Sequence, residues 1–129
     1  MKKTIKIEES LHTQLKQYSK IDWVPPRSNS YLDFAKFMQT QKADIVISPL
    51  CENFFNTCKS PIKYFEYSAL GLPGIFSNIE PYSNVIVNGE NGFLASNIQE
   101  WEKYLLCLIN EANLRKDMAQ KAQNSIQKN

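Results

Sequence analysis

The sequence has few of the residues that bind metals or build disulfide frameworks. Its 129 residues include one histidine, His12, and three cysteines, Cys51, Cys58 and Cys107, with no Cys-x-x-Cys pair. An odd number of cysteines and a single imidazole argue against a zinc site and against a disulfide-stabilised secreted domain. We therefore predict that the protein uses no metal or other cofactor and works in a reducing, cytoplasmic setting.

Long apolar runs and arginines are also scarce. No run reaches the roughly 18 apolar residues that span a bilayer, and Glu8 and Glu9 interrupt the start before an apolar signal core can form. Only Arg27 and Arg115 are arginines, and the net charge of +2 comes from basic residues scattered among acidic ones. Proteins that clamp DNA or RNA concentrate their cations on a stripe, so we predict no nucleic-acid partner.

The residues that are present are typical of one globular domain. Apolar residues make up 43% and charged residues 22% of the chain, which suits a packed core beneath a charged surface. A chain of 129 residues is long enough to bury about two thirds of its unfolded surface. We therefore expect one domain over residues 1–129.

Helical and strand patterns alternate along the chain. The predicted helices are residues 8–18, 30–40, 60–70, 99–110 and 114–126, and the predicted strands are residues 21–24, 43–48, 74–77 and 92–95. Residues 49–58 are expected to form a loop, and residues 81–87 a short helix or an irregular connection. Such alternation predicts an α/β fold with a short, mostly parallel sheet flanked by helices.

Two of these elements carry detailed expectations. Residues 43–48 form the clearest strand, because an uninterrupted apolar run such as Ile45-Val-Ile47 is typical of a strand that is covered on both faces. The helix over residues 99–110 has four apolar residues on one face: Trp101, Leu105, Leu108 and Ile109.

The segment from Lys59 to Pro73 is the most informative part of the sequence. Ser60 is a good helix N-cap and Pro61 suits the first helical position. Gly71 is placed to end the helix in a left-handed conformation, and Pro73 prevents its continuation. A helix with these limits presents free backbone N–H groups at its start.

The charges near this helix start suggest a ligand. Lys59 and Lys63 flank the free amides, which favour an anion such as phosphate, and Glu66 lies about one turn further in. Because ligands of open parallel sheets bind beyond the carboxyl ends of the strands, the strand at residues 43–48 leads the chain to the same place. This combination indicates a nucleotide-sugar site.

Structural explanations compete with these assignments. Ser60, Pro61 and Gly71 are first of all a helix start and stop, and Lys63 and Glu66 are spaced to form a surface ion pair worth a few tenths of a kcal/mol. Asn91-Gly92 is most often a simple turn. Four aromatic residues are more often core than base-stacking platforms: Phe54, Phe55, Tyr64 and Phe65.

A series of short motifs resembles one family. In order they are Ala43-Asp-Ile-Val-Ile-Ser-Pro-Leu50, Phe55-Asn56, Lys59-Ser60, Ile62-Lys-Tyr64, Glu66-Tyr-Ser-Ala69, Gly71-x-Pro73, Ser77, Pro81-Tyr82, Gly89-x-Asn91-Gly92-x-Leu94 and Trp101. Their order and spacing resemble the C-terminal half of GT-B glycosyltransferases of family 4, also called group 1, over about residues 23–126. The resemblance implies a Rossmann-like, three-layer half-domain that binds a nucleotide-diphosphate sugar.

The resemblance also implies roles for individual residues. Glu66 matches a glutamate that accepts hydrogen bonds from the ribose hydroxyls, and the amides of Ile62 and Lys63 match those that face the diphosphate. The predicted binding residues are Phe55, Asn56, Lys59, Ser60, Ile62, Lys63 and Glu66. The implied reaction is a retaining, metal-independent sugar transfer from the donor to an acceptor, as in cell-surface polysaccharide or glycan synthesis.

Two departures from the family pattern limit this expectation. The family's glutamate that contacts the donor sugar, eight positions before Glu66, is replaced by Cys58, so either Lys59 or Glu52 takes over or the sugar contact is altered. The acceptor-binding N-terminal domain and the Arg-Lys pair that stabilises the leaving diphosphate have no counterpart here. We therefore assign no catalytic residue and expect the chain to be inactive alone.

The expected partners follow from the same reasoning. They are the nucleotide sugar, the missing N-terminal domain or a separate partner chain, and a second copy of the chain bound through the face that the missing domain leaves exposed. The intact enzyme is expected in the cytoplasm, peripheral to the inner face of the membrane. The alternative to a donor-binding domain is a non-catalytic remnant that serves as an interaction module.

Overall fold

The chain divides into two compact units, residues 1–41 and 42–129, and each is described by itself. The computed structural model describes residues 31–40 and 42–127. In the first unit, helix α2 (Tyr31–Thr40) confirms the helix predicted over residues 30–40. The helix predicted over residues 8–18 and the strand over residues 21–24 lie outside the described residues.

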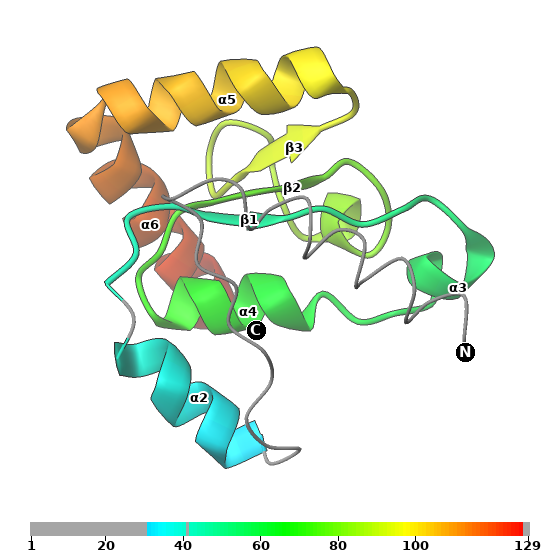
Figure 1. The fold of residues 1–129 in the computed structure, drawn as a ribbon, viewed down its shortest axis with the longest axis horizontal. Helices are drawn as coiled ribbons and strands as arrows, with labels where there is room; N and C mark the ends of the chain where they lie inside the picture. The colour runs from blue at the N-terminus through cyan, green and yellow to red at the C-terminus, as the bar shows by residue number, and fades with distance from the viewer. Residues whose placement is uncertain (1–30, 41, 128–129) are drawn as a thin grey trace, which may run out of the picture. The chain divides into compact units, whose positions relative to one another are not determined.

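The second unit is built on a parallel sheet. Its strands are β1 (Val46–Ser48), β2 (Gly74–Ser77) and β3 (Phe93–Ala95), in the spatial order β1-β2-β3 (Figure 1). Both neighbouring pairs are parallel, with Ser48 opposite Phe76 and Ser77 opposite Ala95. The predicted parallel sheet is confirmed, and all three strands end at the same edge.

Helices and one helical turn lie between the strands or follow the last of them. They are α3 (Phe54–Thr57), α4 (Ile62–Ala69), the 3-10 turn η1 (Tyr82–Asn84), α5 (Ile98–Asn110) and α6 (Ala112–Gln127). Only α3 falls within residues predicted as a loop; it forms because the Asn53 side chain caps its start by accepting from the Asn56 amide. No helix in the described ranges is long and apolar enough to cross a membrane.

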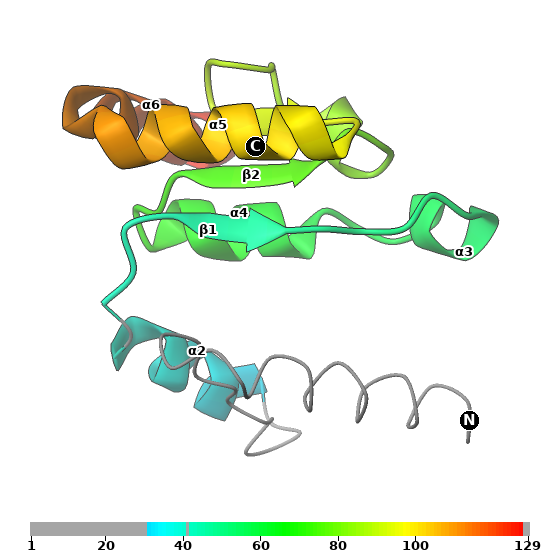
Figure 2. The same ribbon diagram turned by 45° about the horizontal axis from the view of Figure 1, so that its top comes forward.

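The two faces of the sheet are covered by different helices, which gives three layers (Figure 2). On one face, α4 and η1 pack in a cluster of buried residues: Tyr64, Phe76, Tyr82, Ile86, Leu94 and Ala122. On the other, α5 packs in a second cluster: Ile75, Phe93, Ala95, Tyr104, Leu108 and Met118. Helix α6 contributes Ala122 to the first cluster and Met118 to the second, so it joins the two layers.

Some apolar residues are more exposed than the sequence suggested. Ile47 is 50% exposed, whereas its neighbour Val46 is buried, so the expectation that both faces of this strand are covered is wrong at Ile47. Ile109 is 58% exposed, so its place on the apolar face of α5 is wrong, whereas Leu108 is buried as predicted, together with Tyr104. Trp101 and Leu105 are partly buried and pack against the second cluster, as predicted for this side of the helix.

The ends of α4 agree only partly with prediction. Gly71 has φ +75°, and the amides of Gly71 and Leu72 donate to the carbonyls of Ser68 and Tyr67. These two bonds form a Schellman motif, so the predicted glycine stop is confirmed. At the other end Pro61, not Ser60, occupies the N-cap position, and no side chain caps the helix. The N-cap assignment of Ser60 is therefore wrong.

A buried amide links the turn before β3 to α4. Asn91 Nδ2 donates to Tyr64 Oη at 2.9 Å and to the Val85 carbonyl at 3.0 Å, and Asn91 Oδ1 accepts from the Val87 amide at 2.7 Å. Tyr64 Oη also shares a hydrogen bond with Ser125 Oγ of α6. Asn91 thus does more than form a turn, because its side chain joins three separate parts of the unit.

This network gives a stability prediction. We expect Asn91→Ala to lower the free energy of unfolding by about 2 to 4 kcal/mol, because it leaves several buried polar groups without a partner. Urea unfolding followed by circular dichroism would measure the loss. The matched control is Asn113→Ala on the exposed surface of α6, which should change stability by at most about 0.5 kcal/mol. Equal effects of the two substitutions would contradict the structural role of Asn91.

Candidate functional site

The predicted site residues lie along one continuous stretch of chain at the carboxyl edge of the sheet. The chain leaves β1, forms α3 beyond the end of that strand and returns to the start of α4, as both ribbon views show (Figures 1 and 2). This edge is where open parallel sheets bind their ligands. The expected location of the site is therefore present in the fold.

Glu66 carries the least satisfied polar group in the site. Its side chain is only 14% exposed, and Oε2 is buried without a hydrogen-bond partner among the described residues. Lys63 Nζ lies 3.8 Å from this oxygen, which is an ion pair but too long for a hydrogen bond. The expected ion pair thus exists, and it leaves Oε2 able to accept hydrogen bonds.

Tyr67 follows Glu66 on α4 and responds to its charge. Burial raises the pKa of Tyr67 above its ordinary value, and the Glu66 carboxylate and Tyr82 raise it further. The neutral phenol is therefore favoured, and it remains a hydrogen-bond donor at neutral pH. Sequence reasoning did not assign Tyr67 to the site.

The start of α4 has the character of an anion site. The first intrahelical bond runs from the Phe65 amide to the Pro61 carbonyl at 3.3 Å, so Ile62 and Lys63 come before the regular hydrogen-bond ladder. Ile62 is 48% exposed and the Lys63 side chain 41% exposed. The helix dipole and the lysine charge both favour an anion here.

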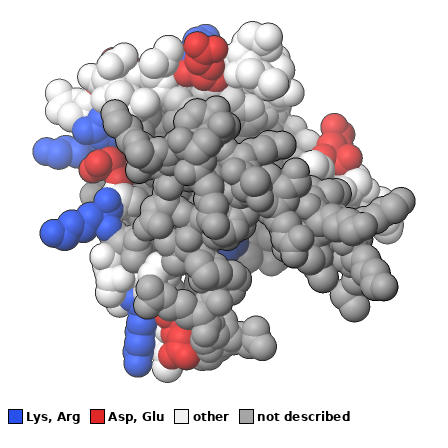
Figure 3. All heavy atoms as spheres, viewed as in Figure 1, with Lys and Arg blue, Asp and Glu red and all other residues white. Residues whose placement is uncertain are grey.

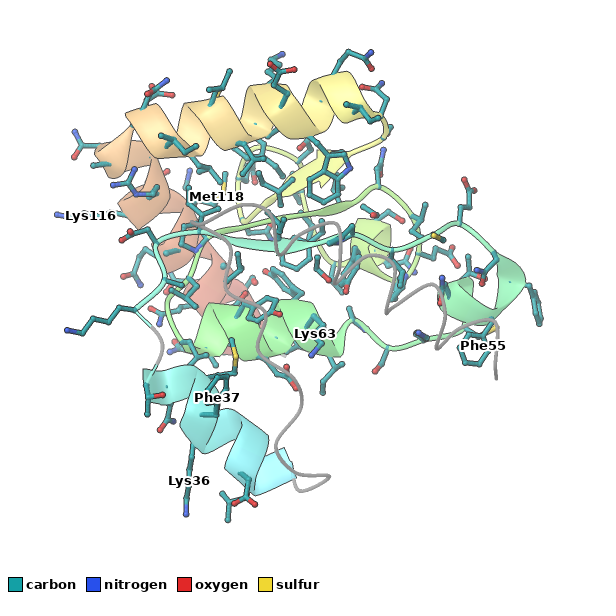
Figure 4. All side chains as sticks on the ribbon, in the orientation of Figure 1. Lys36, Phe37, Phe55, Lys63, Lys116 and Met118 are labelled. Carbon is teal, nitrogen blue, oxygen red and sulfur yellow. The ribbon has the colours of Figure 1, made fainter. Side chains whose placement is uncertain are left out.

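Helix α3 places two aromatic side chains in solvent. Phe54 is 85% and Phe55 72% exposed, so the expectation that they belong to the core is wrong, whereas Tyr64 is buried and Phe65 packs against the first cluster. Lys59 Nζ lies 5.0 Å from the centre of the Phe55 ring. Figure 4 shows Phe55 on α3 and Lys63 on α4, at the two ends of the segment that joins these helices.

The two remaining predicted residues, Asn56 and Ser60, differ in burial and in their contacts. Asn56 is buried, and its Nδ2 donates to the Cys51 carbonyl at 2.6 Å, which folds the loop back on itself. Ser60 is exposed at the approach to α4. The structure thus brings Lys63 to Glu66 and Lys59 to Phe55, while the amide of Asn56 points into the loop.

Hydroxyl groups at the ends of the strands were missed from the sequence. Ser48 Oγ and Tyr82 Oη share a hydrogen bond of 2.7 Å, and Ser77 Oγ accepts from the Leu50 amide at 2.7 Å. Ser48 and Ser77 are the last residues of β1 and β2. The sequence did contain a signal for them, because each serine is a polar residue at the end of an apolar strand.

The charged residues of the described surface are mixed in sign. On the face drawn in Figure 3, lysines and arginines lie beside aspartates and glutamates, without a continuous stripe of either sign among the described residues. Within the same residues, no three histidine, cysteine, aspartate or glutamate side chains are grouped as metal ligands would be. Cys58 is an exposed free thiol.

Comparison with known proteins agrees with this fold. The family model described as "Glycosyl transferases group 1" matches residues 8–125. A crystal structure of the C-terminal domain of a glycosyl transferase group 1 family protein, LpcC, from Francisella tularensis is similar, with a TM-score of 0.69 and 20% sequence identity. The match covers 99% of this chain and 64% of that one. A search of curated proteins found no match.

The coupling between Glu66 and Tyr67 is open to measurement. We expect Glu66→Gln to lower the pKa of Tyr67 toward its ordinary value, because the nearby negative charge is removed while burial remains. Ultraviolet titration would follow the tyrosinate, with Tyr67→Phe in both backgrounds to assign the signal. Glu102→Gln, a charge removed from the exposed side of α5, should leave the titration unchanged. A Tyr67 pKa insensitive to Glu66→Gln would contradict the contact.

Proposed function

Because this chain belongs to the family of group 1 glycosyl transferases, we propose that it binds the nucleotide-diphosphate part of an activated sugar. The proposal concerns the second compact unit, residues 42–129, which holds the sheet edge and α4. The similarity to the LpcC domain supports the fold of this unit, and the site residues give the proposal its chemistry.

The observation that carries the proposal is that Glu66 Oε2 is buried without a hydrogen-bond donor among the described residues, although it pairs loosely with Lys63 at 3.8 Å. A buried carboxylate oxygen without a donor is costly, so native proteins rarely leave one unsatisfied. Glu66 lies one turn beyond Ile62 and Lys63, whose amides come before the regular hydrogen-bond ladder of α4. Two adjacent ribose hydroxyls would supply the missing donors, because one carboxylate can accept from both.

The diphosphate would lie at the start of α4. The amides of Ile62 and Lys63 would donate to its oxygens, and the ammonium groups of Lys63 and Lys59 would offset its charge. Binding would draw Lys63 from its long contact with Glu66 toward the phosphate. Phe55, Asn56 and Ser60 would border the donor from the approach to the helix.

The complete reaction needs groups beyond this site. We propose a retaining, metal-independent transfer in which an acceptor-binding domain or partner chain faces the carboxyl edge of the sheet. The chain spans 64% of the LpcC domain structure that it matches. Charge stabilisation of the leaving diphosphate usually contributes the largest catalytic term, and the residues assigned here supply only part of it, so we expect no transfer by this chain alone.

Isothermal titration with UDP, GDP and their sugar conjugates, with AMP as a control, tests the proposal. We expect selective binding of one diphosphate at millimolar or lower concentration. Glu66→Gln keeps the size of the side chain and should weaken binding by about 1 to 3 kcal/mol, the cost of losing hydrogen bonds to a charged acceptor.

The matched control is again Glu102→Gln, which should bind as the wild type does. Unchanged affinity in Glu66→Gln would remove Glu66 from the site. Absence of binding to every diphosphate by the wild-type chain would reject the donor-binding function itself.

A second candidate, an interaction module, is favoured by the exposure of Phe54 and Phe55 on α3. Adjacent aromatic side chains in solvent are common where proteins associate. If they mediate association, sedimentation velocity should show dimers at high concentration that Phe54→Ser with Phe55→Ser abolishes. A strictly monomeric wild-type chain would count against this candidate.

A further inference from the structure

The chain is held in place by two hydroxyl groups as it leaves the sheet for the proposed donor site. Ser48 Oγ, at the end of β1, shares a 2.7 Å hydrogen bond with Tyr82 Oη. Two residues later, the Leu50 amide donates to Ser77 Oγ at 2.7 Å. We infer that Tyr82 and Ser77 are positioning residues that fix residues 49–58, and through them the start of α4, for binding of the nucleotide diphosphate.

Tyr82 is well suited to this role because its ring is independently fixed. The side chain is buried, and its ring centre lies 4.9 Å from that of Phe76 on β2. Packing therefore sets the place of the ring, and the hydroxyl is delivered to Ser48 with little remaining freedom. Removing only the oxygen should leave the packing intact and release the end of β1.

The connection continues from these anchors to the site. After Leu50, the Cys51 carbonyl accepts from Asn56 Nδ2, and Asn53 caps the helix that carries Phe55. The Lys59 amide donates to the Asn56 carbonyl at 3.1 Å, just before the chain enters α4. These hydrogen bonds link successive parts of the loop. A shift of the backbone at Leu50 would therefore also move Lys59.

Tyr82 also lies near the carboxylate side of the site. The raised pKa of Tyr67 has burial as its first cause, the Glu66 charge as its second and Tyr82 as its third. Tyr67 and Leu50 both pack against the cluster that contains Tyr82. The cluster that holds Tyr82 thus contacts both parts of the site, the loop from β1 through Leu50 and the residue that follows Glu66.

The first test needs no ligand. Amide hydrogen exchange of the full chain should show faster exchange over residues 50–58 in Tyr82→Phe and Ser77→Ala, by about tenfold for the Leu50 amide in Ser77→Ala, the scale of one lost hydrogen bond. Tyr104→Phe is the matched control, because Tyr104 is a buried tyrosine with longer hydroxyl contacts on the opposite face of the sheet. Unchanged exchange over residues 50–58 would overturn the inference.

The second test rests on the proposed function and uses the diphosphate that the wild-type chain binds. Affinity for UDP or GDP, measured where every variant is fully folded, should fall about three- to tenfold in Tyr82→Phe and Ser77→Ala and stay at the wild-type value in Tyr104→Phe. Faster loop exchange with unchanged affinity would overturn the positioning role while leaving the proposed function standing. Failure of the wild type to bind would overturn both, and the exchange experiment would still report on the loop.

Discussion

The hydrogen bond between Asn91 and Tyr64 is the contact on which the placement of the site helix depends. Tyr64 lies two residues before Glu66 on α4, and its hydroxyl meets Asn91 from the turn before β3 and Ser125 from α6. An amide and a phenol in an apolar cluster are costly unless they meet. A rotation or shift of α4 would separate them, so this bond selects one orientation of the helix and of Glu66.

Features that act over a few residues were predictable. The three strands and the helices α4, α5 and α6 follow from short apolar runs and from helix periodicity, and the Gly71 stop follows from one residue's freedom to adopt positive φ. The exception is instructive. Ser60 has the right chemistry for an N-cap, but Pro61 takes that position, with φ −81° and ψ 46°. Composition alone cannot decide between neighbouring residues at a helix boundary.

Features that depend on distant contacts were not predictable. Asn91 resembles any turn residue until Tyr64, 27 positions away, is placed beside it. The same holds for Ser48 and Tyr82, which are 34 positions apart. Phe54 and Phe55 show the opposite error, since their apolar character suggested burial and the turn of α3 exposes them. Glu66 could be singled out because its spacing from a helix start is a local property.

Under the proposed function, the thiol at Cys58 raises the question of which residue contacts the donor sugar. A carboxylate at this position would accept hydrogen bonds from sugar hydroxyls, whereas a thiol is a weak donor and a weak acceptor. Lys59 follows directly, and its ammonium lies over the Phe55 ring, a contact that orients the side chain and leaves N–H groups free to donate. Glu52 lies before α3, on the far side of the Asn53 cap. Under the proposed function, we propose Lys59 rather than Glu52 as the residue that contacts the sugar, and recognition at this point would then use a donor in place of an acceptor.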